Sequence, residues 1–159
     1  MSDNINYGLV VFDWEGTLKM PNTLNTTLIP GALCVLKALK AKSILIGIAT
    51  GSSTQALKQD LEALELTQIF DAWRTAEQTW NKPNPQMLEE ILDECGVAAE
   101  KTLMVGDNVC DMEMAIAAKC DCLGVDFQRR AKQSLLDAGA MATINDYTDF
   151  FTSLLPHSD

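Results

Sequence analysis

Two carboxylates stand one residue apart at the end of the first apolar run of the chain. In VVFDWEGTL, residues 10–18, Asp13 and Glu15 follow the apolar residues, and a glycine and a threonine come next. One carboxylate can act as a nucleophile, and a second one nearby can move a proton. The pair therefore favours a catalytic site at the end of a strand over an ordinary turn.

Later apolar runs also end close to polar side chains. IGIATG ends in Thr50 and Gly51, KPNPQML begins with Lys82, and MVGDNVCDMEMAIAA contains Asp107 and Asp111. Several carboxylates in one cleft repel one another, and a divalent cation removes most of that cost. Because the donors are oxygens, Mg²⁺ is the expected cofactor. With a lysine, a hydroxyl and helix-start N–H groups to bind phosphoryl oxygens, this set predicts phosphoryl transfer through an aspartyl-phosphate.

Strand-like and helix-like segments alternate along the whole chain. The expected strands are residues 8–13, 43–50, 69–75, 102–107, 122–127 and 141–144, and the expected helices are residues 31–42, 54–66, 84–96, 109–120, 129–139 and 147–155. Apolar strands separated by helices are typical of a parallel sheet covered on both faces. The sequence therefore predicts a three-layer, Rossmann-like α/β fold, with its site beyond the carboxyl ends of the strands.

Local signals also predict where three helices begin or end. Pro30 suits the first turn of the helix at 31–42, and either Ser52 or Ser53 can cap the helix at 54–66. Gly96 is a stop signal for the helix at 84–96.

The overall composition limits the classes of partner. The chain has 159 residues and a formal charge of −10, from 12 basic and 22 acidic side chains. This balance argues against nucleic acid as the main partner, because phosphate backbones require a basic face. No apolar run reaches membrane-spanning length, and MSDNINYG lacks a signal-peptide core, so we expect a cytoplasmic protein without a membrane partner. Residues 1–159 are expected to form a single domain.

The four motifs, in this order, resemble those of the haloacid dehalogenase-like hydrolases, especially the phosphoglycolate phosphatase-like branch. VFDWEGTL is similar to the first family motif, D-x-D-G-T, and IGIATG to the second. KPNPQML carries the lysine of the third, and MVGDNVCDMEMAIAA is similar to the fourth, G-D-x-x-x-D. The resemblance runs from about residue 8 to the end of the chain. It implies a magnesium-dependent phosphatase that hydrolyses a phosphate monoester.

The resemblance implies a role for each residue around the phosphoryl group. Asp13 would be the nucleophile, and Glu15 would be the general acid for the leaving alcohol and then the general base for water. Thr50, Gly51 and Lys82 would bind the phosphoryl oxygens, and Lys82 would also anchor the nucleophile.

The same resemblance implies the metal ligands. Asp13, Asp107 and the backbone carbonyl of Glu15 would bind Mg²⁺, and Asp111 would bind the metal or orient its shell. The metal role of residue 15 does not depend on its side chain.

Two features depart from the family pattern. The family usually has aspartate at position 15, so Glu15 carries its carboxyl one methylene further out, and about 1 Å of displacement can cost on the order of a hundredfold in rate. Only KMPNTLNTTLI, residues 19–29, separates the first motif from the next helix, which is too short for the helical cap domain of relatives. The resemblance then implies an open cleft, used with large phosphorylated substrates or with a neighbouring subunit of a homo-oligomer as the lid.

Three other functions share part of this pattern. A carbon–halogen hydrolase would use Asp13 but would not need Asp107 and Asp111. A receiver-type signalling domain uses similar residues in a different chain order. A binding or regulatory protein that has lost turnover through Glu15 and the missing cap is the remaining alternative, and a phosphatase assay with Mg²⁺ separates it from the enzyme.

Overall fold

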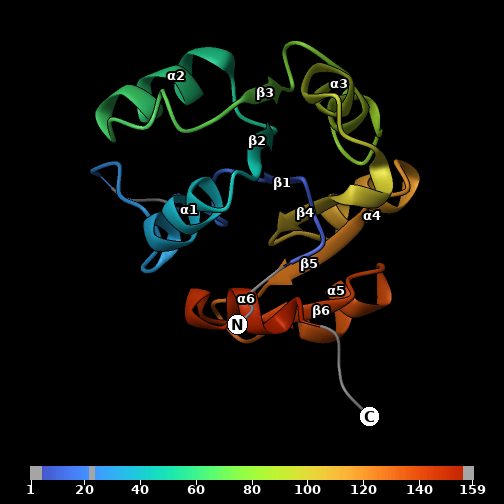
Figure 1. Ribbon diagram of the computed structural model, residues 1–159. Helices are drawn as coiled ribbons and strands as arrows, with labels where there is room; N and C mark the ends of the chain where they lie inside the picture. The colour runs from blue at the N-terminus through green and yellow to red at the C-terminus, as the bar shows by residue number, and fades with distance from the viewer. Residues whose placement is uncertain (1–4, 22–23, 156–159) are drawn as a thin grey trace.

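A six-stranded, fully parallel sheet forms the centre of the computed structural model, which describes residues 5–21 and 24–155 (Figure 1). Its strands are β1 (Leu9–Phe12), β2 (Leu45–Thr50), β3 (Ala72–Thr75), β4 (Thr102–Gly106), β5 (Asp121–Val125) and β6 (Ala142–Ile144). Their order in space is β3-β2-β1-β4-β5-β6. The chain therefore builds one half of the sheet outward from β1 and then returns to build the other half from β4.

Helices cover both faces of this sheet. They are α1 (Ala32–Ala41), α2 (Thr54–Ala63), α3 (Gln86–Cys95), α4 (Val109–Ala117), α5 (Lys132–Asp137) and α6 (Phe150–Ser153), with 3₁₀ turns η1 (Ala99–Lys101) and η2 (Tyr147–Asp149). Figure 1 shows α1, α2 and α6 on one side of the sheet and α3, α4 and α5 on the other. The predicted three-layer α/β fold is confirmed.

The alternation of side chains along β1 divides the core into two apolar clusters. Val10 and Phe12 pack in the cluster under α1, α2 and α6, whereas Leu9 and Val11 pack in the cluster under α3, α4 and α5. All four side chains are fully buried. Burial on both faces explains why this strand is continuously apolar rather than alternating.

Two of the expected helix boundaries are confirmed. The Ser53 hydroxyl accepts a hydrogen bond from the Ala56 N–H at 3.1 Å, so Ser53 rather than Ser52 caps α2. Gly96 ends α3 in the left-handed conformation, as its position predicted.

The start of α1 differs from the prediction. The helix begins at Ala32, and Gly31 precedes it with φ of 86°, so Pro30 lies outside the first turn. A Cβ at Gly31 would lie 2.9 Å from Tyr147 Cβ. The left-handed turn at Gly31 and its contact with the distant residue Tyr147 therefore delay the helix, and neither is visible in the local pattern.

The helices and strands are shorter than predicted, and two segments show a physical reason. Residues 69–71 lie outside β3, because Asp71 instead exchanges hydrogen bonds with the Ile46 backbone through its own N–H and its side chain. The segment 147–155 forms η2 and a four-residue α6 rather than one continuous helix. The Asp146 carboxylate accepts the Thr148 N–H at 2.8 Å, which favours a tight first turn there.

The segment between β1 and α1 contains only turns and two isolated bridges among its described residues, Glu15 with Lys19 and Lys19 with Leu28. No additional domain is inserted there within the part of the chain that the structure describes. Over the same described residues, no helix combines the length and apolar character needed to cross a membrane.

Candidate active site

The topology brings the predicted motifs to one edge of the sheet. β1 lies between β2 and β4, with Phe12 in register with Ile48 on one side and Val105 on the other. Asp13 follows β1 directly, and all three strands run in parallel, so the ends of β2 and β4 flank it. This is the point where the strand order reverses, and ligands of doubly wound sheets bind in the crevice there.

The third motif reaches this edge from the loop after β3. Lys82 Nζ lies 3.0 Å from Asp13 Oδ1 and 2.6 Å from Asp111 Oδ1. The lysine side chain is only 6% exposed, and that of Asp111 is fully buried. One ammonium group therefore links the strand-end aspartate to the helix α4.

Three carboxylates, two of which contact this ammonium group, lie close to one another. Asp13, Asp107 and Asp111 each offer an oxygen atom, and these atoms lie within 4.8 Å of one another. Burial and then the Asp13 charge raise the pKa of Asp107 to about 6. The same two causes raise the pKa of Asp111 to about 7, although Lys82 opposes the change. A single lysine does not neutralise this cluster.

The charge of Lys82 is itself fixed by these neighbours. Burial would lower its pKa, but the charges of Asp13 and Asp111 outweigh burial and hold the pKa well above its usual range. Lys82 is therefore a permanent cation in the site and cannot serve as a general base near neutral pH.

The donor set fits a hard divalent cation. The oxygens are carboxylates, they converge, and burial together with the Asp13 charge raises the pKa values of Asp107 and Asp111. Mg²⁺ prefers such oxygen donors and is commonly held by one or two carboxylates with waters. The cluster is thus a candidate metal site formed by Asp13, Asp107 and Asp111.

Asp111 is held firmly from its own helix. Asn108 caps α4, and the Asn108 N–H donates to Asp111 Oδ2 at 3.2 Å, which completes a capping box. A Cβ at Gly106 would lie 2.3 Å from the same oxygen, so this position requires glycine. Both Asp111 oxygens have protein partners, which favours a role in positioning Lys82.

Asp107 is supported by residues that sequence reasoning missed. The Thr17 hydroxyl donates to Asp107 Oδ1 at 3.1 Å, and the Tyr147 hydroxyl donates to the Thr17 carbonyl at 2.5 Å. Gly16 has φ of 85°, and a Cβ there would lie 2.4 Å from Asp107 Oδ2. Gly16 and Thr17 of the first motif therefore position the carboxylate of Asp107 in the fourth motif. The G-T pair hinted at this role, whereas nothing in the local sequence pointed to Tyr147.

The expected phosphate-binding residues lie beside Asp13. Thr50 is buried, and its hydroxyl oxygen accepts the Ser52 N–H and donates to the Ser52 hydroxyl, each at 3.1 Å. Gly51 lies next to Asn81, whose side-chain oxygen accepts the Lys82 N–H at 2.9 Å. Ser52 and Asn81 were not predicted as site residues, although each adjoins one that was.

A single cleft of about 270 Å³ collects most of these groups. It is lined by Asp13, Glu15, Thr50, Gly51, Ser52, Asn81, Lys82, Asp107, Asn108 and Cys110. Every predicted site residue except Asp111 lines it, and Asp111 is buried beneath, in contact with Lys82. The structure thus brings together residues from four separate motifs.

Glu15 lies at the exposed rim of this cleft. The neighbouring Trp14 is buried, and its indole N–H donates to Asp60 Oδ2 at 2.9 Å. Lys19 pairs with the same Asp60 oxygen at 3.0 Å. The loop that carries Glu15 is therefore fastened to α2 on both sides of it, which limits the movement of the glutamate backbone.

With this fold and site in view, the chain belongs to the haloacid dehalogenase-like hydrolase family, whose pattern matches residues 10–125. It is 33% identical over 119 residues to a phosphoglycolate phosphatase of Rhodospirillum rubrum, a match that covers 74% of this chain and 49% of that protein. It is 29% identical over 147 residues to a phosphoglycolate phosphatase of Escherichia coli, covering 91% and 55% respectively. The chain spans about half the length of these curated relatives.

Solved structures share the fold at lower identity. A putative β-phosphoglucomutase from Thermotoga maritima has a TM-score of 0.82 at 19% identity, covering 92% of this chain and 97% of that chain. A family hydrolase from Deinococcus radiodurans, crystallised with bound phosphate and sodium, has a TM-score of 0.81 at 15% identity, covering 97% and 100%. These similarities establish the fold.

Proposed function

We propose that this chain is a phosphatase that hydrolyses phosphate monoesters through an aspartyl-phosphate on Asp13. The observation that carries the proposal is the contact of Lys82 with Asp13, at 3.0 Å, inside a cluster of three carboxylates. A cation at this distance holds the aspartate in place and can also bind a phosphoryl oxygen. Membership of the hydrolase family and the phosphatase relatives support the same chemistry.

Asp13, Asp107 and the backbone carbonyl of Glu15 would hold Mg²⁺, with Asp111 behind them. When bound, the cation would neutralise phosphoryl charge and relieve the repulsion among the carboxylates. The donor set fits this cation because it is made of oxygens in one converging cluster.

In the first half of the reaction, an Asp13 oxygen attacks phosphorus. A bond forms between that oxygen and phosphorus, and the bond from phosphorus to the ester oxygen of the substrate breaks. Glu15 donates its proton to the leaving oxygen, so an alcohol departs. Lys82 and the groups around Thr50 bind the phosphoryl oxygens during the transfer.

In the second half, a water molecule attacks the phosphoryl group. Glu15, now ionised, accepts a proton from the water, and the Asp13–phosphorus bond breaks to release inorganic phosphate and restore the carboxylate. Glu15 suits both steps because it lies at the rim of the cleft that Asp13 also lines.

The substrate is then a phosphorylated molecule, either small or larger. We further propose that residues 1–159 act as one domain, because both apolar clusters pack on a single sheet. No cap covers the cleft in this proposal. A second copy of the chain is a candidate lid, and sedimentation with and without substrate tests it.

The decisive experiment is a phosphate-release assay with Mg²⁺ on acetyl phosphate, phosphoglycolate and larger monoesters. We expect Asp13→Asn to abolish turnover, because an amide cannot form the acyl-phosphate. Asp93→Asn, an exposed change on α3, is the matched control and should keep full activity. Radiolabelled phosphoenzyme should form in the control and be absent from Asp13→Asn.

Substantial turnover by pure Asp13→Asn protein would rule out the covalent mechanism. If the wild type also releases no phosphate from any ester, yet binds Mg²⁺ and a phosphoryl mimic, the alternative of a binding or regulatory protein takes the place of the enzyme. The binding-protein alternative is tested because the extra methylene of Glu15 displaces the carboxyl group that would transfer protons.

A further inference from the structure

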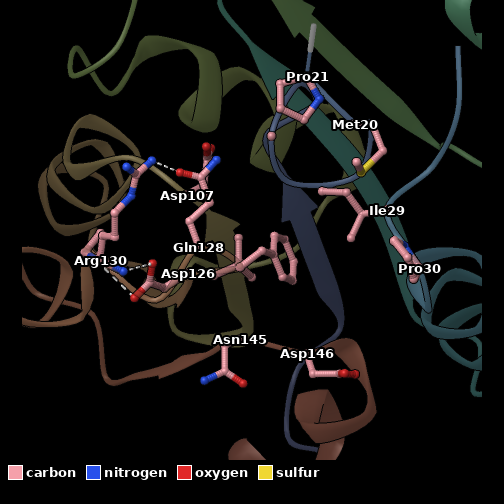
Figure 2. Close-up of a pocket in the computed structure, with 14 residues that line it drawn as sticks. Met20, Pro21, Ile29, Pro30, Asp107, Asp126, Gln128, Arg130, Asn145 and Asp146 are labelled. Atoms are coloured by element: carbon pink, nitrogen blue, oxygen red, sulfur yellow. Dashed lines mark hydrogen bonds between the residues drawn. The ribbon is translucent and has the colours of Figure 1, made fainter. Parts of the chain in front are cut away.

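A second and larger cavity adjoins the proposed catalytic cleft. Its volume is about 780 Å³, and it lies between the segment after β1 and the segments after β5 and β6. Figure 2 shows Met20 and Ile29 on one side of it, facing Asp126 and Gln128 on the other. Ligand sites in proteins commonly measure about 300–1,000 Å³, so the cavity is large enough for a whole organic group.

The cavity and the cleft meet at two points of the proposed machinery. Asp107 lines both of them. Gly16 lines the cavity, and its chain neighbour Glu15 lines the cleft. The group that would protonate the leaving alcohol therefore lies at the junction, where the ester oxygen of a substrate must be if its phosphoryl group occupies the cleft.

One side of the cavity is apolar. Met20, Pro21, Ile29 and Pro30 line it from the segment after β1, and Phe127 contributes an aromatic ring. The Phe127 ring packs against Tyr147 at a centroid distance of 5.2 Å, which holds the ring in place. Such a surface suits the face of a ring system.

The opposite side is polar but offers little positive charge. Asp126 and Asp146 line it together with Arg130, and Asp107 adds a third carboxylate. Asp126 accepts the backbone N–H groups of Arg130 at 2.9 Å and Ala131 at 3.1 Å, so it remains part of the local structure. A carboxylate on the leaving group would meet a net negative environment here.

Neutral hydrogen-bonding groups complete this wall. Gln128 and Asn145 present side-chain amides, each with donors and an acceptor. The Arg130 guanidinium donates to the Gln128 side-chain oxygen, and among the residues that the structure describes the Gln128 amide N–H groups have no acceptor. Amides are suited to reading the polar edge of an uncharged ring.

We infer that this cavity binds the leaving group of the substrate, and that this group is an uncharged alcohol of nucleoside size with an apolar face and a polar edge. This inference rests on the proposed phosphatase function. It assigns a substrate class other than that of the phosphoglycolate phosphatase relatives, because glycolate is small and negatively charged. Uridine and adenosine 5′-monophosphate are probes of the inferred class.

The test compares a cavity-filling variant with a matched control. Gln128→Trp places a bulky ring at an exposed position that lines the cavity, whereas Gln133→Trp makes the same change on the exposed face of α5, away from the cavity lining. We expect Gln128→Trp to lower kcat/KM for the nucleoside monophosphates at least about tenfold and to leave acetyl phosphate within about twofold. Gln133→Trp should change neither.

Calorimetry separates this inference from the proposed function. With Mg²⁺ present, Asp13→Asn protein should bind adenosine or uridine 5′-monophosphate at least about tenfold more tightly than phosphoglycolate, and Gln128→Trp in that background should remove the difference. Equal binding of the two substrate types, or equal loss for all substrates in Gln128→Trp, overturns the inference even if phosphatase activity is present. Preferential nucleotide binding by Asp13→Asn protein, together with no turnover by the wild type, supports the cavity assignment and refutes the phosphatase.

Discussion

Lys82 and Asp111 form an ion pair of 2.6 Å in which the aspartate is fully buried and the lysine nearly so. The pair joins the loop after β3 to the first turn of α4, and the same ammonium group reaches Asp13. The position of the proposed nucleophile therefore depends on a contact between two segments 29 residues apart. This dependence makes Lys82 a structural element as well as the proposed phosphoryl-binding group.

Lys82→Ala is expected to destabilise the fold as well as abolish activity. Removal of one partner leaves a buried carboxylate without its counter-ion, which typically costs about 3–5 kcal/mol. The loss of unfolding free energy should be larger at pH 8.5 than at pH 5.5, because Asp111 can take up a proton at the lower pH. Chemical denaturation at both pH values measures this loss. Lys40→Ala, which breaks a more exposed pair with Asp71, should cost less than about 1 kcal/mol.

Stability of the metal-free protein should fall as pH rises from about 4 to 8. Burial and then the Asp13 charge raise the pKa of Asp107 to about 6 and that of Asp111 to about 7. Through this window the folded chain retains protons that the unfolded chain has released, so folding becomes less favourable with increasing pH. Asp107→Asn should therefore stabilise the metal-free protein at pH 8, on the order of 2 kcal/mol, and have little effect at pH 4.

Urea denaturation in the presence of a chelator measures this pH dependence. Addition of Mg²⁺ should flatten the wild-type profile, because a bound cation replaces the protons. An Asp107→Asn profile parallel to the wild type at every pH would contradict the assignment of Asp107 to the carboxylate cluster.

Mg²⁺ binding should depend on Asp107 but not on nearby surface acids. We expect Asp107→Ala to weaken Mg²⁺ binding at least about tenfold in calorimetric titration, since it removes a direct oxygen donor. Glu113→Ala, an exposed change on α4, is the control and should leave the titration unchanged. Identical Mg²⁺ titrations of Asp107→Ala and Glu113→Ala would show that the carboxylate cluster is not the metal site.

Glu15→Gln should reduce phosphate release by about 10²–10⁴-fold, because proton transfer to the leaving group and from water is lost. Phosphoenzyme should accumulate in this variant with acetyl phosphate, whose leaving group needs little protonation. Glu15→Asp tests side-chain length without a change of charge. An increase in its turnover would mean that the extra methylene impairs the wild type, and a decrease would mean that the glutamate is matched to its substrate.

Asp60 is a positioning residue for the loop that carries Glu15. Its carboxylate accepts the Trp14 indole N–H at 2.9 Å, pairs with Lys19 at 3.0 Å and accepts the Thr26 hydroxyl at 3.3 Å. Asp60→Ala should lower kcat more than it changes KM and should leave Mg²⁺ affinity intact. Asp60→Asn keeps an acceptor oxygen for the indole, so its kcat should lie between those of Asp60→Ala and the wild type.

Intrinsic tryptophan fluorescence and steady-state kinetics follow the Asp60 variants, with exposed Glu62→Ala on α2 as the control. Loss of the Trp14 hydrogen bond should cost about 1–3 kcal/mol in unfolding experiments. Full activity in Asp60→Ala would show that the loop needs no anchor on α2.

The sequence by itself determined the layers of the fold and most of the residues that gather at the candidate site. Continuous apolar runs such as β1 are compatible only with burial on both faces, and their alternation with helices implies a parallel sheet. Parallel strands end at the same edge of a sheet. The sequence alone therefore assigns Asp13, Thr50 and Asp107, which lie at the ends of β1, β2 and β4, to one site. Lys82, in the segment after the expected strand at 69–75, could be assigned to the same site.

Only the tertiary structure decided the contacts that support and extend this site. Tyr147 bonds to Thr17 from the far end of the chain, and the same residue restricts position 31 to glycine and so delays α1. The burial of Asp111 beneath Lys82 and the cavity beside Asp107 arise where segments distant in sequence pack together. Periodicity and spacing report the local environment of a residue, whereas these features depend on the relative placement of whole elements, which no local pattern encodes.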